Sequence, residues 1–263
     1  MKLMLHGRSL VYEEAGHGQA TIFVHGYPLD HTMWKPQLQG LRVHVRCIAP
    51  DLRGFGESEG TGESSSMDDF ASDLVGLMDE LRVERAALCG LSMGGYVALA
   101  FAEHWPDRLS GLVLANTRSG ADSEAAREAR LKSATTAQEQ GADAIVDGLL
   151  PRMLAESTRA QRPEVSEQVR QMMARQPVSG IAGALRGMAG RPDRTSVLSR
   201  IRCPALVITG SADALIPPSE SEAMAAAIPG AKLVIIPEAG HLSNLEQPEA
   251  FNAALREFFL RLR

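Results

Sequence analysis

One stretch, residues 86–100, constrains the fold of this chain more than any other, and its sequence is AALCGLSMGGYVALA. An apolar run too short for a helix ends at Cys89, and an alanine-rich segment with helical character begins just after Ser92. This order predicts a strand, a sharp turn and a helix. Gly90 and Gly94 flank the serine in the G-x-S-x-G pattern of a nucleophile elbow, where the turn is so tight that a Cβ at either glycine would collide. The alternative is a serine that only caps the helix, a position that serine favours.

Composition places the chain among ordinary globular proteins. It has 263 residues, 44% of them hydrophobic and 22% charged, with a formal net charge of -5. This charge, without a cluster of basic and aromatic residues, argues against a nucleic-acid partner. Cys47, Cys89 and Cys203 lack CxxC spacing and are expected to be reduced core residues, as in the cytoplasm. The apolar run among the first residues is too short for a signal peptide. No run in the sequence reaches the roughly 18 apolar residues that a membrane span needs.

Apolar runs and helical patterns alternate along most of the chain, which predicts an α/β fold. The expected fold is a mostly parallel sheet of about eight strands with helices on both faces. We expect strands at 2–6, 9–13, 20–24, 43–49, 86–89, 109–115, 205–209 and 232–236, and helices at 32–41, 67–81, 93–100, 219–227 and 248–260.

The alternation stops between residues 118 and 203, where no segment has the pattern of a buried strand. Val165, Val169 and Met172 recur at helical spacing after Pro163, a favourable first helical residue. The sequence therefore predicts a core domain made of residues 1–117 and 204–263, with a helical cap, 118–203, inserted after the sixth strand.

A serine hydroxyl needs a general base, which a carboxylate in turn orients. His241 lies between the last expected strand and the closing helix, and Asp213 lies just past the strand at 205–209. Both positions fall at the carboxyl edge of the sheet, where Ser92 also lies and where open α/β sheets bind ligands. The sequence thus predicts Ser92, Asp213 and His241 as catalytic residues; the alternative for Asp213 is a helix cap.

Five motifs in this order resemble the α/β-hydrolase superfamily, in particular its compact bacterial branch with a helical cap. They are HGYP at 25–28, DLRGFGES at 51–58, GLSMGG at 90–95, GSAD at 210–213 and GH at 240–241. Within that superfamily the chain resembles small carboxylesterases, 3-oxoadipate enol-lactonases and cofactor-free haloperoxidase/perhydrolase relatives.

The resemblance implies an oxyanion hole made by the backbone N–H groups of Tyr27 and Met93. In that arrangement His25 is structural and braces the turn that carries Tyr27. The ring of Tyr27 and Trp34 are candidates to line the substrate pocket, with a place in the core as the alternative for both. Arg53 is expected to shape a loop behind the site.

The resulting prediction is a serine carboxylesterase that cleaves a small ester or lactone through an acyl-enzyme, with no cofactor and no metal. The alternatives are an enol-lactonase, a C–C bond hydrolase, a haloperoxidase/perhydrolase and a small-molecule receptor with the same triad. An anionic lactone substrate would require basic residues at the pocket, and Arg118, Arg152, Arg186 and Arg191 are the candidates. The Leu, Met and Val residues of the cap instead favour apolar groups. The sequence contains no signal for the oligomeric state.

Overall fold

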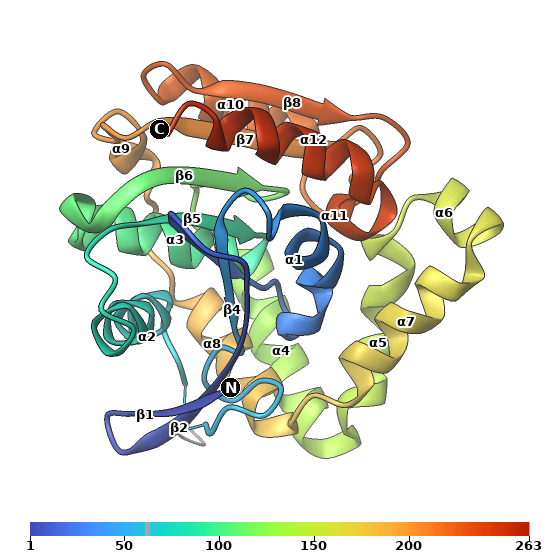
Figure 1. The fold of residues 1–263 in the computed structure, drawn as a ribbon. Coiled ribbons are helices and arrows are strands. Elements are labelled where there is room, and N and C mark those ends of the chain that lie inside the picture. The colour runs from blue at the N-terminus through green and yellow to red at the C-terminus, as the bar shows by residue number, and fades with distance from the viewer. Residues whose placement is uncertain (61–63, 263) are drawn as a thin grey trace.

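An eight-stranded sheet with the order β1-β2-β4-β3-β5-β6-β7-β8 organises the computed structural model, which describes residues 1–60 and 64–262 (Figure 1). Strand β2 is antiparallel to both β1 and β4, and the remaining neighbours are parallel. The bounds are β1 Lys2–Leu5, β2 Arg8–Ala15, β3 Ala20–Val24, β4 Arg46–Pro50, β5 Ala86–Leu91, β6 Leu109–Ala115, β7 Ala205–Gly210 and β8 Lys232–Ile236. The predicted mostly parallel sheet is confirmed.

Helices cover both faces of this sheet because successive side chains of a buried strand point to opposite sides. In β3, Ile22 and Val24 belong to the core cluster shared with α2 and α3, whereas Phe23 belongs to the cluster shared with α1 and α12. The helices of the two layers are α1 Lys35–Leu41, α2 Met67–Glu80, α3 Met93–His104, α10 Pro218–Ala227, α11 Ser243–Glu246 and α12 Pro248–Phe259.

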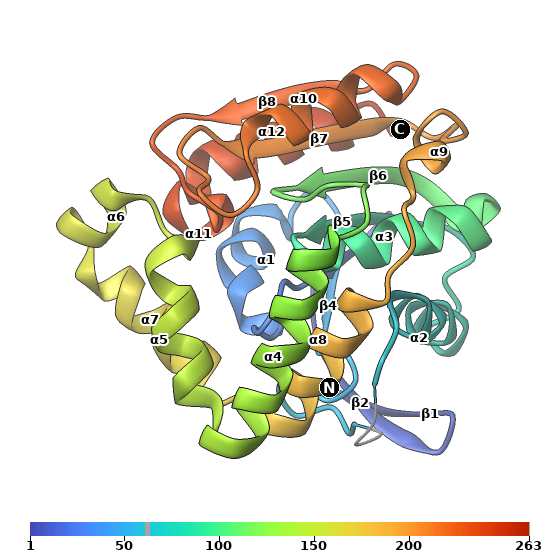
Figure 2. The same cartoon turned by 180° about the vertical axis from the view of Figure 1, so that it is seen from behind.

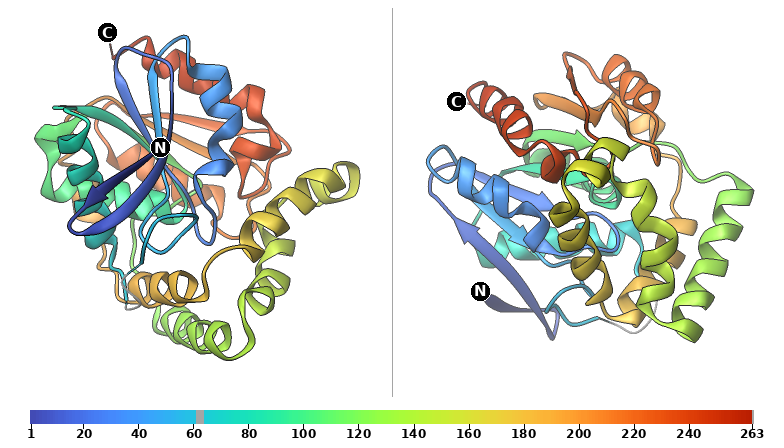
Figure 3. Two further views of the ribbon diagram at one scale, coloured as in Figure 1. Left: turned by 60° about the horizontal axis from the view of Figure 1, so that its bottom comes forward. Right: turned by 90° about the vertical axis from the view of Figure 1, so that its right-hand side faces the viewer.

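Residues 118–203 are all described, and none of them lies in a strand. Their helices are α4 Glu124–Gln140, α5 Ala142–Met153, α6 Glu156–Gln161, α7 Pro163–Ala174, α8 Val178–Ala189 and α9 Thr195–Leu198. Helices α5, α6 and α7 lie beyond the end to which β6 and β7 point (Figures 1 and 2), and Figure 3 shows them projecting beside the sheet. Helix α8 packs closely on the core. Gly180 lies so near Gly54 that a Cβ on Gly180 would overlap the carbonyl oxygen of Gly54.

The ends of most expected elements differ from the structure by one to four residues, and two of these differences show how the backbone is arranged there. The helix expected at 32–41 begins with a short 3-10 helix, η1 His31–Trp34, before α1, and a second such helix, η2 Pro106–Arg108, follows α3. The strand expected from residue 43 begins only at Arg46, because the N–H groups of His44 and Val45 both donate to the carbonyl of Leu41 and form a turn. In the described part of the chain, no helix combines the length and the apolar character that crossing a membrane requires.

Candidate active site

Ser92 occupies the turn between β5 and α3, with φ 56° and ψ -116°. A Cβ on Gly90 would overlap the carbonyl oxygen of Gly94, and a Cβ on Gly94 would overlap that of Val24. These contacts explain both glycines, and the predicted order of strand, sharp turn and helix is confirmed. Although Ser92 immediately precedes α3, its side chain makes no capping hydrogen bond. The hydroxyl is therefore not used to cap the helix.

The His241 imidazole is oriented by Asp213, since its Nδ1 donates to Asp213 Oδ2 over 2.8 Å. The other carboxylate oxygen accepts from the N–H groups of Leu215, at 2.9 Å, and Ile216, at 3.0 Å. Burial alone would raise the pKa of Asp213, but the nearby His241 and these hydrogen bonds outweigh it and lower the pKa. An ionised Asp213 holds the hydrogen on Nδ1, which leaves Nε2 of His241 free to accept a proton.

Asn116 is a buried support of this pair that the sequence analysis missed. Its Nδ2 donates to Asp213 Oδ2 at 2.9 Å and to the carbonyl of Gly240 at 3.2 Å, and its Oδ1 accepts from Ser243 Oγ at 2.6 Å. The residue directly follows β6 and has a φ of 46°, a conformation that Asn tolerates better than most residues. Its place after a strand at the carboxyl edge was the sequence signal that could have identified it.

Ser92 and His241 line one cavity of about 130 Å³. Within residues 1–60 and 64–262 their side chains form no hydrogen bond with each other, so the structure shows proximity through a shared cavity rather than direct contact. The other lining residues are Tyr27, Tyr96, Arg118, Arg130, Leu149, Met188, Leu215 and Ile216. Tyr27, a candidate from the sequence, is thus one of the residues that line this cavity.

The prediction that Trp34 lines the substrate pocket is wrong for this cavity. The side chain is absent from the lining and is fully buried in the core, which was the alternative. Its ring lies between those of Phe23, at a centroid distance of 5.3 Å, and Phe251, at 6.1 Å. The aromatic side chain stabilises the packing of η1 and α12 on the sheet. The sequence could not decide between these places, because an aromatic residue that follows a turn can lie in the pocket lining or in the core with the same neighbours in sequence.

The turn after β3 lies against Ser92, since a Cβ on Gly26 would be 3.4 Å from the Ser92 Cβ. His25 braces this turn: its Nε2 accepts from the Leu52 N–H at 2.9 Å, so the hydrogen on Nδ1 can donate to the Gly26 carbonyl, also at 2.9 Å. Complete burial lowers the pKa of His25. Among the described residues, the backbone N–H groups of Tyr27 and Met93 donate to no other group of the chain.

Glu246 joins the loop of His241 to the helical insertion. Its Oε1 accepts from the N–H groups of Gly240, at 2.9 Å, and Leu242, at 3.2 Å. Its Oε2 accepts from the Ala155 N–H, at 2.8 Å, and the Thr158 hydroxyl, at 2.7 Å. The side chain is fully buried, so four donors replace its hydration.

Of the four arginines considered from the sequence, Arg118 alone is among the residues that line the cavity. Arg152 is exposed, Arg186 donates to Gln138 at 2.6 Å, and Arg191 lies over the Tyr96 ring at 4.1 Å from its centroid. Arg130 lines the cavity and was missed. It belongs to α4, whose sequence has no apolar stripe that could show which side faces the core.

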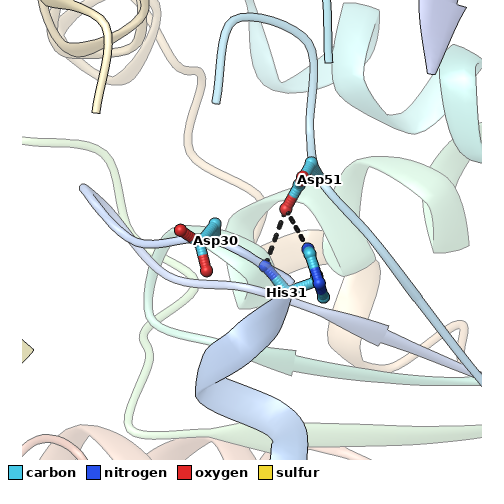
Figure 4. A group of neighbouring side chains, drawn as sticks. All are labelled: Asp30, His31 and Asp51. Atoms are coloured by element: carbon cyan, nitrogen blue, oxygen red, sulfur yellow. Dashed lines mark hydrogen bonds and ion pairs between the residues drawn. The ribbon is translucent and has the colours of Figure 1, made fainter. Parts of the chain in front are cut away.

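Asp30, His31 and Asp51 form a second cluster of polar side chains, whose candidate ligand atoms lie within 4.8 Å of one another (Figure 4). Asp51 accepts from both the backbone N–H and Nδ1 of His31, at 2.8 Å and 2.7 Å, and from the Glu57 N–H at 3.0 Å. Asp30 accepts from Arg175 Nε at 2.8 Å. Because donors already occupy these carboxylates, the cluster fits a role in fastening loops better than a metal site.

Arg53 is not among the residues that line the cavity, and it pairs with Asp73 of α2 at 2.5 Å. It also donates to the carbonyl of Asp69 at 3.1 Å. These contacts fasten the loop after β4 to α2, in agreement with the expectation that Arg53 shapes a loop.

Comparisons with known proteins agree with this architecture. A sequence model described as alpha/beta hydrolase fold matches residues 20–248. The 3-oxoadipate enol-lactonase 1 of Acinetobacter baylyi is 31% identical over 232 residues, which are 88% of this chain and 85% of that protein. A solved thermophilic esterase from Thermogutta terrifontis, with malate bound, is 44% identical with a TM-score of 0.97, covering 100% of this chain and 98% of that one. The enol-lactonase from Burkholderia xenovorans is 30% identical with a TM-score of 0.92, covering 99% and 100%.

Proposed function

We propose that this chain, which belongs to the α/β hydrolase fold family, is a serine carboxylesterase. It would cleave small esters through an acyl-enzyme on Ser92. The observation that carries the proposal is the shared cavity: the free hydroxyl of Ser92 and the imidazole that Asp213 orients both line it. A nucleophile, an oriented base and a space for a substrate are the components that acyl transfer needs.

In the proposed first step, the Ser92 oxygen attacks the ester carbonyl carbon while its proton passes to Nε2 of His241. The ester C–O bond then breaks, and the leaving alcohol oxygen takes that proton. In the second step, His241 removes a proton from water, the hydroxide attacks the acyl carbon, and the proton returns to Ser92 as the acid leaves. The proposal requires the Ser92 hydroxyl and Nε2 of His241 to come within hydrogen-bond distance in the complex with substrate, where catalytic hydrogen bonds often tighten.

The N–H groups of Tyr27 and Met93 are the proposed oxyanion hole. Gly26 packs against Ser92, and His25 holds the adjacent turn, which supports a fixed position for the Tyr27 N–H beside the reacting carbonyl. Met93 is the first residue of α3, where an unused N–H and the helix dipole both favour negative charge. Such donors typically lower the barrier by about 3–4 kcal/mol each.

A lactone is the second candidate substrate. Two relatives that are 30% and 31% identical to this chain over most of its length carry the name enol-lactonase. Hydrolysis of a lactone uses the same attack on a carbonyl, and only the leaving group differs, since the alcohol stays attached to the acyl part. The helical insertion, whose Leu149 and Met188 line the cavity, is the proposed cap that selects between these substrates.

The test is hydrolysis of p-nitrophenyl acetate and butyrate by the wild type and by Ser92→Ala. We expect turnover by the wild type and a fall in kcat of about three orders of magnitude or more in the variant, since the nucleophile is lost. A fluorophosphonate should label the wild type once per chain and leave Ser92→Ala unlabelled. Equal turnover by the two proteins would contradict the proposal, and labelling without turnover would favour a receptor.

A further inference from the structure

The cavity beside Ser92 has an excess of positive charge. Arg118 and Arg130 both line it, and Arg191 lies directly behind them. The three guanidinium groups share one buried carboxylate, that of Asp122, with N···O distances of 2.5 Å, 2.5 Å and 2.8 Å. Asp122 therefore forms ion pairs with all three arginines but balances only one of their charges. Glu220 and Asp193 act on Arg118 and Arg191, respectively, without forming an ion pair with them.

The three arginines differ in how many of their donors the protein already uses. Arg191 is fastened on several sides: besides Asp122, it donates to the carbonyls of Met188 and Gly120, both at 3.0 Å. Its Nε has no partner among the described residues, but the side chain is only 2% exposed and does not line the cavity, which fits a structural role.

Arg118 and Arg130, by contrast, keep donors in reserve. Arg118 uses Nη2 on Asp122, and its Nε is buried without a partner among the described residues. Arg130 uses Nε on Asp122, and its other contact within that part of the chain is a weak one to the Met188 sulfur at 3.5 Å. A guanidinium has five N–H donors, so both residues can still bind an anion.

Tyr27 adds a neutral donor to the same cavity. Its hydroxyl is buried and has no partner among the described residues, although the side chain lines the cavity. Burial raises the pKa of this phenol, so it stays protonated and can donate. A buried hydroxyl without a partner is costly, and a polar group of a ligand would satisfy it.

We infer that Arg118 and Arg130 form an anion subsite that binds a carboxylate on the substrate, so the enzyme acts on small esters or lactones that carry a free carboxylate. The inference rests on the proposed acyl transfer at Ser92, which lines the same cavity. The carboxylate would bind on the side of the helical insertion, where α4 begins, while the scissile carbonyl lies at Ser92. A volume of about 130 Å³ restricts the bound part to a short chain.

The experiment compares two methyl esters that differ only at the far end of the acyl chain, monomethyl succinate and methyl butanoate, at about pH 7.5 with a pH-stat. The first ends in a carboxylate where the second ends in a methyl group. We expect kcat/KM of the wild type to be at least about 10-fold higher for the half-ester. Succinate should also inhibit hydrolysis of methyl butanoate competitively.

The variant Arg130→Gln removes the charge and keeps one N–H donor group, on a shorter side chain whose amide nitrogen corresponds to the arginine Nε. We expect the ratio of kcat/KM for the half-ester to that for methyl butanoate to fall about 10- to 100-fold, the loss typical of a hydrogen bond to a charged group. Arg130→Lys should restore part of the ratio. The matched control is Arg186→Gln, which changes an arginine of the same insertion that bonds Gln138 on α4 and does not line the cavity. It should leave the ratio at its wild-type value.

The outcomes separate this inference from the proposed function. If the wild type hydrolyses methyl butanoate at least as well as the half-ester and succinate does not inhibit it, the anion subsite is wrong while the esterase stands. If neither ester is hydrolysed, calorimetric titration of succinate into the wild type and Arg130→Gln decides: binding that weakens in the variant supports the subsite, and no binding overturns it. These wild-type measurements are decisive even if the variant fails to fold.

Discussion

Ser92 has a backbone conformation that costs most residues about 1–3 kcal/mol, so the surrounding structure must impose it. The Ser92 N–H donates to the Ala115 carbonyl at 2.9 Å, and Gly90 and Gly94 supply the room that the turn needs. The turn directs the side chain to the cavity instead of to the helix end. Glycine is therefore required at positions 90 and 94 because a Cβ there would overlap neighbouring backbone atoms, and not because the turn must be flexible.

His25 offers a residue-scale test of stability against pH. Burial lowers its pKa below the usual 6.5 in the folded protein, so the unfolded chain binds a proton first as the pH falls. Its contribution to stability is therefore complete above about pH 6.5 and is lost as the pH falls from there toward the folded-state pKa. We expect His25→Gln to be less stable than the wild type by about 1–3 kcal/mol at pH 8, because the bond between the two loops is impaired.

The difference between these two proteins should then shrink between pH 7 and pH 5, as measured by melting temperature. His31, whose pKa is raised mainly by Asp51 against the opposing effect of burial, is present in both proteins, and so its contribution to the difference largely cancels. A difference that stays constant or widens as the pH falls would show that His25 is not buried in its neutral form.

At the scale of elements, the connection between α11 and the insertion depends on Glu246. Replacement by Gln keeps the shape but turns one acceptor into a donor, which then faces the donors of either Gly240 and Leu242 or Ala155 and Thr158. We expect Glu246→Gln to lower the free energy of unfolding by about 2 kcal/mol or more, since buried donors lose their acceptor. Hydrogen exchange should quicken at residues 153–158 and 240–242.

The control for this prediction is Glu249→Gln, three residues further along the chain. Glu249 is exposed, so its replacement should change the free energy of unfolding by no more than about 0.5 kcal/mol. If the two variants were equally stable, Glu246 would not hold the His241 loop to the insertion.

The elements themselves could be predicted well because their patterns are local. Strands β6 and β8 have the predicted bounds, and α7 begins at the expected Pro163. The sequence could also place Ser92, Asp213 and His241 at one edge, since parallel strands end together there. It could not identify Glu246, whose partner Ala155 is 91 residues away. It also could not place Arg130 at the cavity, because α4 has no apolar stripe that shows which side faces the core. Such contacts depend on how the helices dock, which no local pattern contains.

At the scale of the whole molecule, the helical insertion is tied to the core at several separate points. Arg175 donates to Asp30 at 2.8 Å, and Gln176 accepts from the Gly56 N–H at 2.8 Å. At the other end of the sheet, Arg194 donates to Glu103 at 3.0 Å. Further contacts join the Met153 carbonyl to the His241 loop. Ties spread over the molecule in this way favour unfolding of the insertion together with the core.

We therefore expect one cooperative transition in guanidinium chloride. The protein contains two tryptophans, Trp34 and Trp105, and both lie outside residues 118–203, so their fluorescence reports on the core. Circular dichroism at 222 nm reports on all helices, including α4 to α8 of the insertion. The two signals should have the same midpoint, and Gly180→Ala, which forces α8 away from Gly54, should shift both midpoints together to lower denaturant. If ellipticity is lost before fluorescence changes, the insertion unfolds by itself, and its hydrogen bonds to the core are too weak to couple the unfolding of the two parts.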